Sequence, residues 1–117
     1  MNKVIAISAG DSNNIVINSE GNVYGWGANI YGELGIPNNI VVTKPTKIEN
    51  SKNINYIDGG KGYNLAINNN QEVYAIGLNV SGELGNSSKN NIVELTKLNT
   101  IENVINISAG NGYTVFL

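Results

Sequence analysis

The sequence Val-Tyr-Gly-Trp-Gly-Ala-Asn at residues 23–29, followed by Gly-Glu-Leu-Gly at residues 32–35, decides the fold. Fifty residues later the chain reads Val-Tyr-Ala-Ile-Gly-Leu-Asn at residues 73–79, and Gly-Glu-Leu-Gly returns unchanged at residues 82–85. Shifting the sequence against itself by this period aligns close to a third of the overlapping positions as identities. Self-similarity at a period of about 20 to 50 residues is the signature of repeat architectures. The chain is therefore a tandem repeat.

The repeat extends to both ends of the chain. Residues 4–10 align with residues 54–60 and 104–110, and apolar residues fall at matching positions in all three segments. A chain of 117 residues suffices for one domain core, so we expect a single repeat domain over residues 1–117. Its copies would span residues 4–53 and 54–103, with a partial copy at residues 104–117.

Each copy contains about four short β-branched or aromatic runs separated by Gly, Asn and Ser, with no helical stripe. In the first copy we expect a hairpin turn at Gly21, which can take positive φ. In the second copy Gln71 stands there, and we expect Asn69 or Asn70 to take that conformation instead. The polar residues 36–44 and 86–94 predict outer surface loops. The strands expected in the first copy are residues 5–9, 14–18, 22–26 and 45–48.

Four antiparallel strands per copy, joined by hairpins, indicate a blade of a β-propeller rather than a coil of a solenoid. We therefore predict an all-β fold of about two four-stranded blades plus partial strands at the termini. The aromatic residues Tyr24, Trp26 and Tyr74 lie inside predicted strands. We expect them to pack between neighbouring blades.

The order of these motifs resembles the regulator of chromosome condensation repeat family. The resemblance rests on the strand ending Ser-Ala-Gly at residues 8–10 and on the two motifs quoted first, and it covers essentially the whole chain. It implies blades of a closed ring, which has seven blades in members of the family. Some residues depart from the family pattern. Asn13, Tyr63 and Tyr113 stand where His is frequent, Glu33 and Glu83 where Gln is frequent, and Leu95 where Pro is frequent. These departures leave the expected fold unchanged, but they weaken any inference of partner-binding residues from the family.

Two copies and a fraction supply between two and three blades, so one chain does not close such a ring. The open ends would leave strand edges and apolar blade faces in water. We expect either a fragment of a larger propeller or a chain that associates with copies of itself to complete its blades. A start in mid-blade at Val4 and an end in mid-blade at Leu117 would suit exchange of terminal strands.

The composition excludes several classes of function. With a net charge of −2 and scattered basic residues, the chain lacks the basic surface that binds nucleic acid. It has no Cys and no His, so thiolate metal sites and the commonest general base are absent. Glu33 and Glu83 occupy equivalent positions a blade apart, too far to form a hydrolytic pair. Asp11 with Asn13 and Asn14 lacks the several carboxylates of a calcium loop. We expect no enzymatic activity, no cofactor and no metal site.

The repeated glycines indicate backbone geometry, because their spacing matches no phosphate-binding loop and no helix follows them. The repeat positions that we assign to structure are Gly10, Gly27, Gly35, Gly60, Gly77, Gly85 and Gly110.

The loops after Gly10, Gly60 and Gly110 vary between copies while the flanking strands do not, as expected of a rigid scaffold that presents changeable loops. We expect a non-catalytic protein-interaction scaffold. The alternative is a propeller that binds a glycan or a small molecule; the resemblance also raises guanine-nucleotide exchange, which is less favoured because it needs a complete ring. The candidate partner-contact residues are Asp11, Asn13, Lys61, Tyr63, Asn111 and Tyr113.

The location of the protein is indicated only by what the sequence lacks. No run approaches the roughly 20 apolar residues of a membrane span, and the N-terminus turns polar too soon for a secretory signal. We expect a soluble cytoplasmic protein, with secretion as part of a longer protein left open. The abundance of Asn, Ile and Lys suggests a bacterial source.

Overall fold

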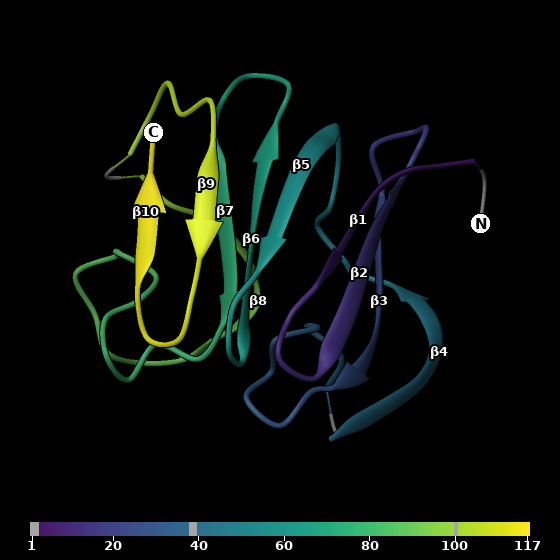
Figure 1. The fold of residues 1–117 in the computed structure, drawn as a ribbon, viewed down its shortest axis with the longest axis horizontal. Helices are drawn as coiled ribbons and strands as arrows, with labels where there is room; N and C mark the ends of the chain where they lie inside the picture. Colours follow the sequence, from purple (N-terminus) through teal and green to yellow (C-terminus); the bar gives the residue numbers. More distant parts are fainter. Residues whose placement is uncertain (1–2, 38–39, 100) are drawn as a thin grey trace.

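The computed structural model describes residues 3–37, 40–99 and 101–117. Within these ranges all regular secondary structure is β-strand (Figure 1). No helix in this part of the chain is long and apolar enough to cross a membrane. The strands are β1 (Val4–Ala9), β2 (Asn13–Asn18), β3 (Val23–Ala28), β4 (Val41–Lys47), β5 (Ile54–Gly59), β6 (Tyr63–Asn68), β7 (Val73–Gly77), β8 (Ile92–Lys97), β9 (Ile107–Ala109) and β10 (Thr114–Phe116).

The first four strands form an antiparallel meander in the order β1-β2-β3-β4, which we call blade 1. Its β2–β3 turn is closed by Asn18, whose Oδ1 accepts hydrogen bonds from the amides of Glu20 and Asn22, both at 3.0 Å. Asn side chains commonly bond nearby backbone groups in this way. Gly21 has a φ of 79°, as predicted. The hairpin therefore follows from the local sequence.

Strands β5 to β8 repeat this meander as blade 2, with the order β5-β6-β7-β8. Asn68 closes its β6–β7 turn as Asn18 does in blade 1, through bonds from the amides of Asn70 and Glu72. The expectation for positive φ is wrong here, because Gln71 itself has a φ of 63°. The Asn68 contacts fix the turn geometry, so the residue aligned with Gly21 takes the left-handed conformation whatever its identity.

The fourth strand of each blade begins earlier than expected. Val41 pairs with Ala28 in blade 1 and Ile92 pairs with Gly77 in blade 2, although both residues were predicted to lie in loops. The prediction was wrong because pairing with β3 and β7 continues across the same register shift in both copies, with Pro45 in one and Leu95 in the other. The register shift between Gly25 and Gly27 leaves residues 43–45 outside the regular pairing, which accommodates the proline. Residues 38–39 of the predicted loop lie outside the described residues.

The last two strands, β9 and β10, pair in a separate two-stranded sheet, which we call the partial blade. In sequence they correspond to β1 and β2, the first two strands of a complete blade. The expectation that the chain starts in mid-blade at Val4 is wrong, since β1 is the edge strand of a complete four-stranded sheet.

The three sheets stack in sequence order, and the apolar core lies between them (Figure 1). Strand β5 contacts β1 and β2, and β9 contacts β5 and β6. Of the three strand aromatics expected to pack between blades, Trp26 and Tyr74 pack against the cluster between blades 1 and 2, and Tyr24 is not among the residues packed on it. That cluster is Ile15, Ile17, Val23, Leu34, Val42, Ile48, Ile54, Ile57, Ala66, Ile76 and Leu95. The cluster between blade 2 and the partial blade is Tyr63, Leu65, Ile67, Val73, Ala75, Leu84, Leu98, Val104 and Ile107.

Candidate partner-binding loops

Three equivalent turns lie together at one end of the stack, the lower end in Figure 1. They join β1 to β2, β5 to β6 and β9 to β10. In each, the amide of the second residue of the Ala-Gly or Gly-Gly pair closes the turn with the same hydrogen bond. The amides of Gly10, Gly60 and Gly110 donate to the carbonyl oxygens of Asn13, Tyr63 and Tyr113 at 3.0, 2.9 and 3.0 Å. We call this end of the molecule the loop end.

Gly10, Gly60 and Gly110 are required because neighbouring atoms lie too close to leave room for a Cβ, and not because of their φ angles. A Cβ on Gly60 would overlap the ring of Tyr63, and a Cβ on Gly110 would overlap the ring of Tyr113. Gly27 and Gly77 differ, since both have positive φ, at 110° and 113°. Each of these glycine positions therefore has a structural requirement of its own.

Backbone hydrogen bonds connect each turn to the next. The amide of Asp11 donates to the Gly60 carbonyl at 3.4 Å, and the amide of Lys61 donates to the Gly110 carbonyl at 3.0 Å. The loops of successive blades are thus held in register with one another.

A second set of links lies one residue earlier in the repeat. The Gly59 amide donates to Ser8 Oγ at 3.0 Å, and the Ala109 amide donates to Asp58 Oδ2 at 2.6 Å. Ser8 and Asp58 are equivalent positions, so both junctions use the same kind of contact with a different side chain. These links make the loop end a rigid platform.

Four of the six predicted contact residues are exposed on this platform. Asp11, Lys61 and Asn111 hold equivalent positions in the three turns, and their side chains face solvent. Tyr113 is 64% exposed. The structure therefore gathers one acid, one base, one amide and one aromatic side chain at the loop end.

The other two predicted residues, Asn13 and Tyr63, are buried. The Tyr63 hydroxyl donates to the carbonyl oxygen of Tyr113 and accepts from the Gly110 amide at 3.0 Å and from Thr114 Oγ1 at 3.2 Å. We call this set of bonds the Tyr63 clasp, because it joins blade 2 to the partial blade. A side chain placed in this way holds the scaffold together and offers no surface to a partner.

Asn13 occupies the equivalent position at the junction of blades 1 and 2 but is too short to form such a clasp. Its Oδ1 is buried and, among the described residues, has no hydrogen-bond partner. The same holds for Oδ1 of Asn64, which is equivalent to the Thr114 that bonds the Tyr63 hydroxyl. Each orphaned oxygen thus belongs to a residue aligned with a member of the Tyr63 clasp, Asn13 with Tyr63 and Asn64 with Thr114.

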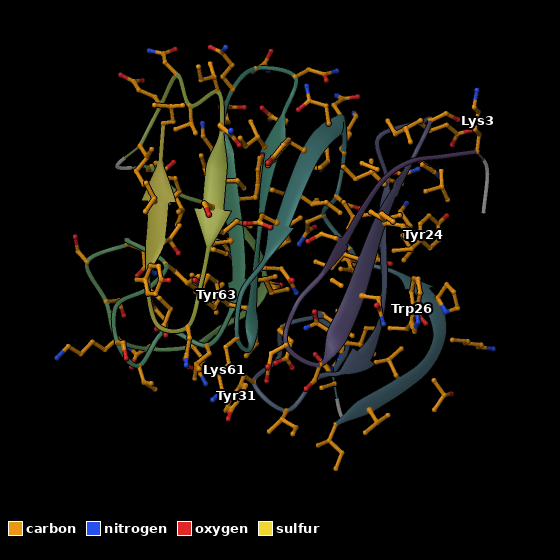
Figure 2. All side chains as sticks on the ribbon, viewed as in Figure 1. Lys3, Tyr24, Trp26, Tyr31, Lys61 and Tyr63 are labelled. Carbon is orange, nitrogen blue, oxygen red and sulfur yellow. The ribbon has the colours of Figure 1, made fainter. Side chains whose placement is uncertain are left out.

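A cavity of about 140 Å³ opens at this junction. Figure 2 shows Lys61 and Tyr31 next to each other at its rim, and Tyr31 packs over Gly62. Tyr31 was not predicted from the sequence, because its counterpart in the second copy is Ser81 and the repeat therefore gave no signal. The lining residues are Asp11, Ser12, Asn13, Ala28, Ile30, Tyr31, Glu33, Lys61 and Gly62.

Glu33 is the buried acid of this cavity. Its Oε1 accepts a hydrogen bond from the Tyr31 amide at 3.2 Å, and Asn64 Nδ2 donates to its carbonyl oxygen at 2.9 Å. Burial raises the pKa of the Glu33 carboxyl, although the Tyr31 bond opposes the rise. These bonds fix the Gly-Glu-Leu-Gly turn, and the neighbouring Leu34 is fully buried. The role of Glu33 is therefore to hold the loop in place.

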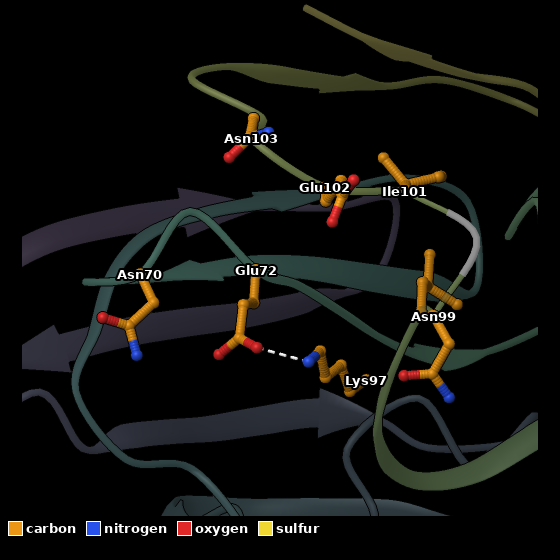
Figure 3. Close-up of a pocket in the computed structure, with 8 residues that line it drawn as sticks. Asn70, Glu72, Lys97, Asn99, Ile101, Glu102 and Asn103 are labelled. Atoms are coloured by element: carbon orange, nitrogen blue, oxygen red, sulfur yellow. Dashed lines mark ion pairs between the residues drawn. The ribbon is translucent and has the colours of Figure 1, made fainter.

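A different hollow, of about 210 Å³, lies away from the predicted contact loops (Figure 3). Glu72 and Lys97 form an ion pair on its wall. The hydrogen bond from Asn68, followed by the contact with Lys97, lowers the pKa of the Glu72 carboxyl. The pair links the β6–β7 turn to the end of β8 at the surface of blade 2. Within the described residues, no three acidic side chains come close enough together to hold a metal ion.

Comparison with known sequences gives the family. A model of the regulator of chromosome condensation (RCC1) repeat matches residues 20–67 and 70–117, and a second model of that repeat matches residues 4–33. The chain belongs to the RCC1 repeat family. Its all-β blades are therefore RCC1-type propeller blades. No curated protein matches the sequence.

Solved structures share the RCC1 fold. Prp20p from Saccharomyces cerevisiae matches 97% of this chain at 19% identity with a TM-score of 0.87, and human WBSCR16 matches 99% at 23% identity with the same TM-score. A chain in the crystal structure of Kap60 bound to yeast RCC1 (Prp20) matches 97% at 22% identity with a TM-score of 0.83. The present chain spans only 27–31% of the length of these structures.

Proposed function

We propose that this chain is a non-catalytic protein-interaction scaffold whose partner binds at the loop end. The observation that carries the proposal is the set of exposed, chemically different side chains on three rigidly linked turns. Binding residues are commonly placed on loops held by a rigid scaffold. The contact residues in this proposal are Asp11, Lys61, Asn111 and Tyr113.

The comparisons support a binding role for this kind of propeller. Prp20p is described by its binding to Gsp1p and histones, and yeast RCC1 (Prp20) by its complex with Kap60. This chain spans 30% and 27% of those structures, so neither exchange activity nor those partners is assigned to it. The net charge of −2 favours a protein partner over nucleic acid.

The size of the loop-end cavity bears on the alternative of a small-molecule or glycan site. Drug-sized ligands occupy pockets of about 300 to 1,000 Å³. The cavity between blades 1 and 2 measures about 140 Å³, which is room for one side chain of a partner rather than for a sugar. The loop-end cavity therefore does not favour a glycan site there. A larger hollow, of about 560 Å³, lies between the first Gly-Glu-Leu-Gly turn and β8, and it keeps the small-molecule alternative open.

We also propose that the faces at the two ends of the stack bind further RCC1 blades. Association with other copies of the chain would supply them, and so would a longer propeller that contains these residues.

The function is tested with a loop variant that combines Asp11→Ala, Lys61→Ala and Asn111→Ala. A matched control combines Glu49→Ala, Lys52→Ala and Asn99→Ala, which removes the same kinds of exposed side chain outside the loop end. Partners retained by the wild-type chain from cells of its source are identified by mass spectrometry and then titrated as purified proteins.

We expect the loop variant to bind the partner more than about tenfold more weakly, since truncating an interface hot spot costs about 2 kcal/mol. The control should bind like the wild type. Equal binding by all three proteins, or no retained partner, would contradict the proposal.

A further inference from the structure

The hollow of about 560 Å³ between the first Gly-Glu-Leu-Gly turn and β8 is an open groove, which we call the β8 groove. Blade 1 forms one side of it through the loop that carries this turn, and blade 2 forms the other through β8. Gly32 packs directly on Val93 and brings the two sides together. The side chains that give the groove its character are Ile30, Ile36, Pro37, Ile40, Val93 and Glu94.

The β8 groove exposes large apolar side chains to solvent. Ile30 is 66% exposed, Ile40 is 71% exposed and Val93 is 65% exposed. Single exposed apolar residues are ordinary, but several that line one hollow mark an interaction site. The three side chains come from two blades and surround the same space, so they form one binding surface.

Exposure in the β8 groove does not depend on where the chain begins or ends. Ile30 belongs to blade 1 and is followed by the complete blade 2, and Val93 belongs to blade 2 and is preceded by the complete blade 1. The position of Ile40 is exposed in both copies, since Asn90 is exposed in the blade that has another blade before it. Further blades at either end of the stack would therefore leave the groove open.

The repeat does not require apolar residues at these positions. The groove residues and their equivalents in the other copy are Ile36 and Asn86, Pro37 and Ser87, Ile40 and Asn90, and Val93 and Thr43. Each equivalent is polar, and both copies fold into the same four-stranded blade. The fold is thus satisfied by polar residues here, and the apolar wall indicates a ligand.

Glu94 gives the β8 groove its charge. It is the one charged residue among those that line the groove, and within the described part of the chain its carboxylate forms no ion pair. The equivalent residue of the first copy is Lys44, so the blade does not need an acid at this position. Charge complementarity favours a ligand that carries a basic group next to its apolar part.

The β8 groove is continuous with the loop end. Ile30 lines both this groove and the cavity between blades 1 and 2, and the next residue, Tyr31, lies at the rim of that cavity. A protein seated on the loop end can therefore reach into the groove without crossing another part of the surface.

We propose that the β8 groove binds an extended segment of a partner protein in which apolar residues stand next to Lys or Arg. The apolar side chains of the segment would lie between Ile30, Ile40 and Val93, and its basic side chain would pair with Glu94. The walls are largely exposed side chains of two blades, a shape that suits a chain segment laid along them. The inference goes beyond the function proposed for the loop end, because the groove can bind such a segment by itself.

Each variant in the test introduces the residue that the other copy carries at that position, so the fold should be kept. Ile40→Asn and Val93→Thr make the groove polar, and Glu94→Lys reverses its charge. The control is Ile5→Asn, the same change at an exposed isoleucine of β1 that does not line the groove and whose equivalent is Asn55. Circular dichroism verifies the β structure of every protein.

The probe is a panel of fluorescent peptides in which two apolar residues stand beside Lys, Glu or Ser in a Gly-Ser sequence. Anisotropy titrations should show that the wild type and Ile5→Asn prefer the Lys peptides. Ile40→Asn and Val93→Thr should each weaken binding about fivefold to tenfold, because less apolar surface is buried. Glu94→Lys should prefer the Glu peptides by about threefold at low salt, a preference that high salt should remove.

Absence of peptide binding by the wild type would overturn the inference, as would groove variants that bind like the control. An unchanged preference for Lys peptides in Glu94→Lys would contradict the ion pair. Binding of apolar amines of drug size without peptide binding would assign the groove to a small molecule instead. The loop variant with Asp11, Lys61 and Asn111 replaced should bind the panel like the wild type, so failure of the groove and failure of the loop end are distinguishable.

Discussion

At the scale of single residues, one repeat position decides how neighbouring blades are joined. Tyr63 bonds three groups of the partial blade through its hydroxyl, and Asn13 at the preceding junction leaves two amide oxygens without partners in the described part of the chain. Asn13 also leaves room for the cavity at that junction. The same position thus serves as a clasp in one copy and as the wall of a candidate site in another.

We predict that Tyr63→Phe lowers the free energy of unfolding by roughly 1 to 2 kcal/mol, because it removes the buried hydroxyl from its three bonds and leaves the packing intact. Denaturant unfolding at low protein concentration measures the difference. The matched control is Tyr113→Phe, whose hydroxyl lies on an exposed side chain and should contribute little. Equal losses in the two variants would show that the clasp contributes nothing of its own.

The alignment of Asn13, Tyr63 and Tyr113 was predictable from the sequence, but their different environments were not. Each side chain is directed toward the following copy, so its burial depends on whether a blade follows. Tyr63 was predicted as a contact residue because it lies in a variable loop, and only the position of the partial blade shows that it is buried. Tyr31 was missed because residues of different chemistry, Tyr31 and Ser81, occupy that position in the two copies.

At the scale of elements, the turn between the second and third strands is fixed by the asparagine before it. Asn18 and Asn68 accept the same pair of amide bonds, and the third residue after each has positive φ. Gly21 adopts this positive φ without steric strain. Gln71 adopts the left-handed conformation against its own preference, at a cost of about 1 kcal/mol.

Replacing Gln71 by glycine should therefore raise the free energy of unfolding by about 1 kcal/mol. Gln71→Ala is the control, since it removes the side chain but keeps the Cβ that disfavours positive φ, and its stability should match the wild type. Thermal and denaturant unfolding both report the change. Stabilisation of the alanine variant by the same amount would assign the effect to the side chain rather than to the backbone.

The elements themselves were predictable where local sequence determines them. The hairpin turn at Gly21 and the repeated four-strand pattern followed from turn residues and alternation. The starts of β4 and β8 did not, because residues 41–44 and 92–94 contain polar residues or precede a proline. These segments join the sheets through pairing with β3 and β7 across a register shift, which is information from the neighbouring strand.

At the scale of the whole molecule, the ends of the stack are its least satisfied surfaces. Ile7 and Val115 are exposed at positions where the inner copies bury their counterparts, and a further blade packed on either end would bury them in the same way. The sequence indicated an open stack from the number of copies. It did not indicate which side chains form each end face, since that depends on the direction in which blades pack.

Cross-linking tests most directly whether the two end faces are halves of one contact. Within the chain, Asp58 bonds the Ala109 amide, and the equivalent contact between copies would join Ser108 to Ala9 of the next copy. The chain has no cysteine, so Ser108→Cys and Ala9→Cys can be introduced in separate chains and mixed under oxidising conditions. A variant with both Asp58→Cys and Ala109→Cys is the internal control, because the Asp58 side chain already reaches the backbone of Ala109.

We predict that the mixture of Ser108→Cys and Ala9→Cys chains forms a mixed disulfide dimer, while Ala9→Cys mixed with a cysteine at Asn99 does not. Mass spectrometry of the non-reduced dimer identifies the joined residues. If the internal control oxidises and the Ser108–Ala9 dimer fails to form, the end faces of this RCC1 stack do not meet in the way that its blades do.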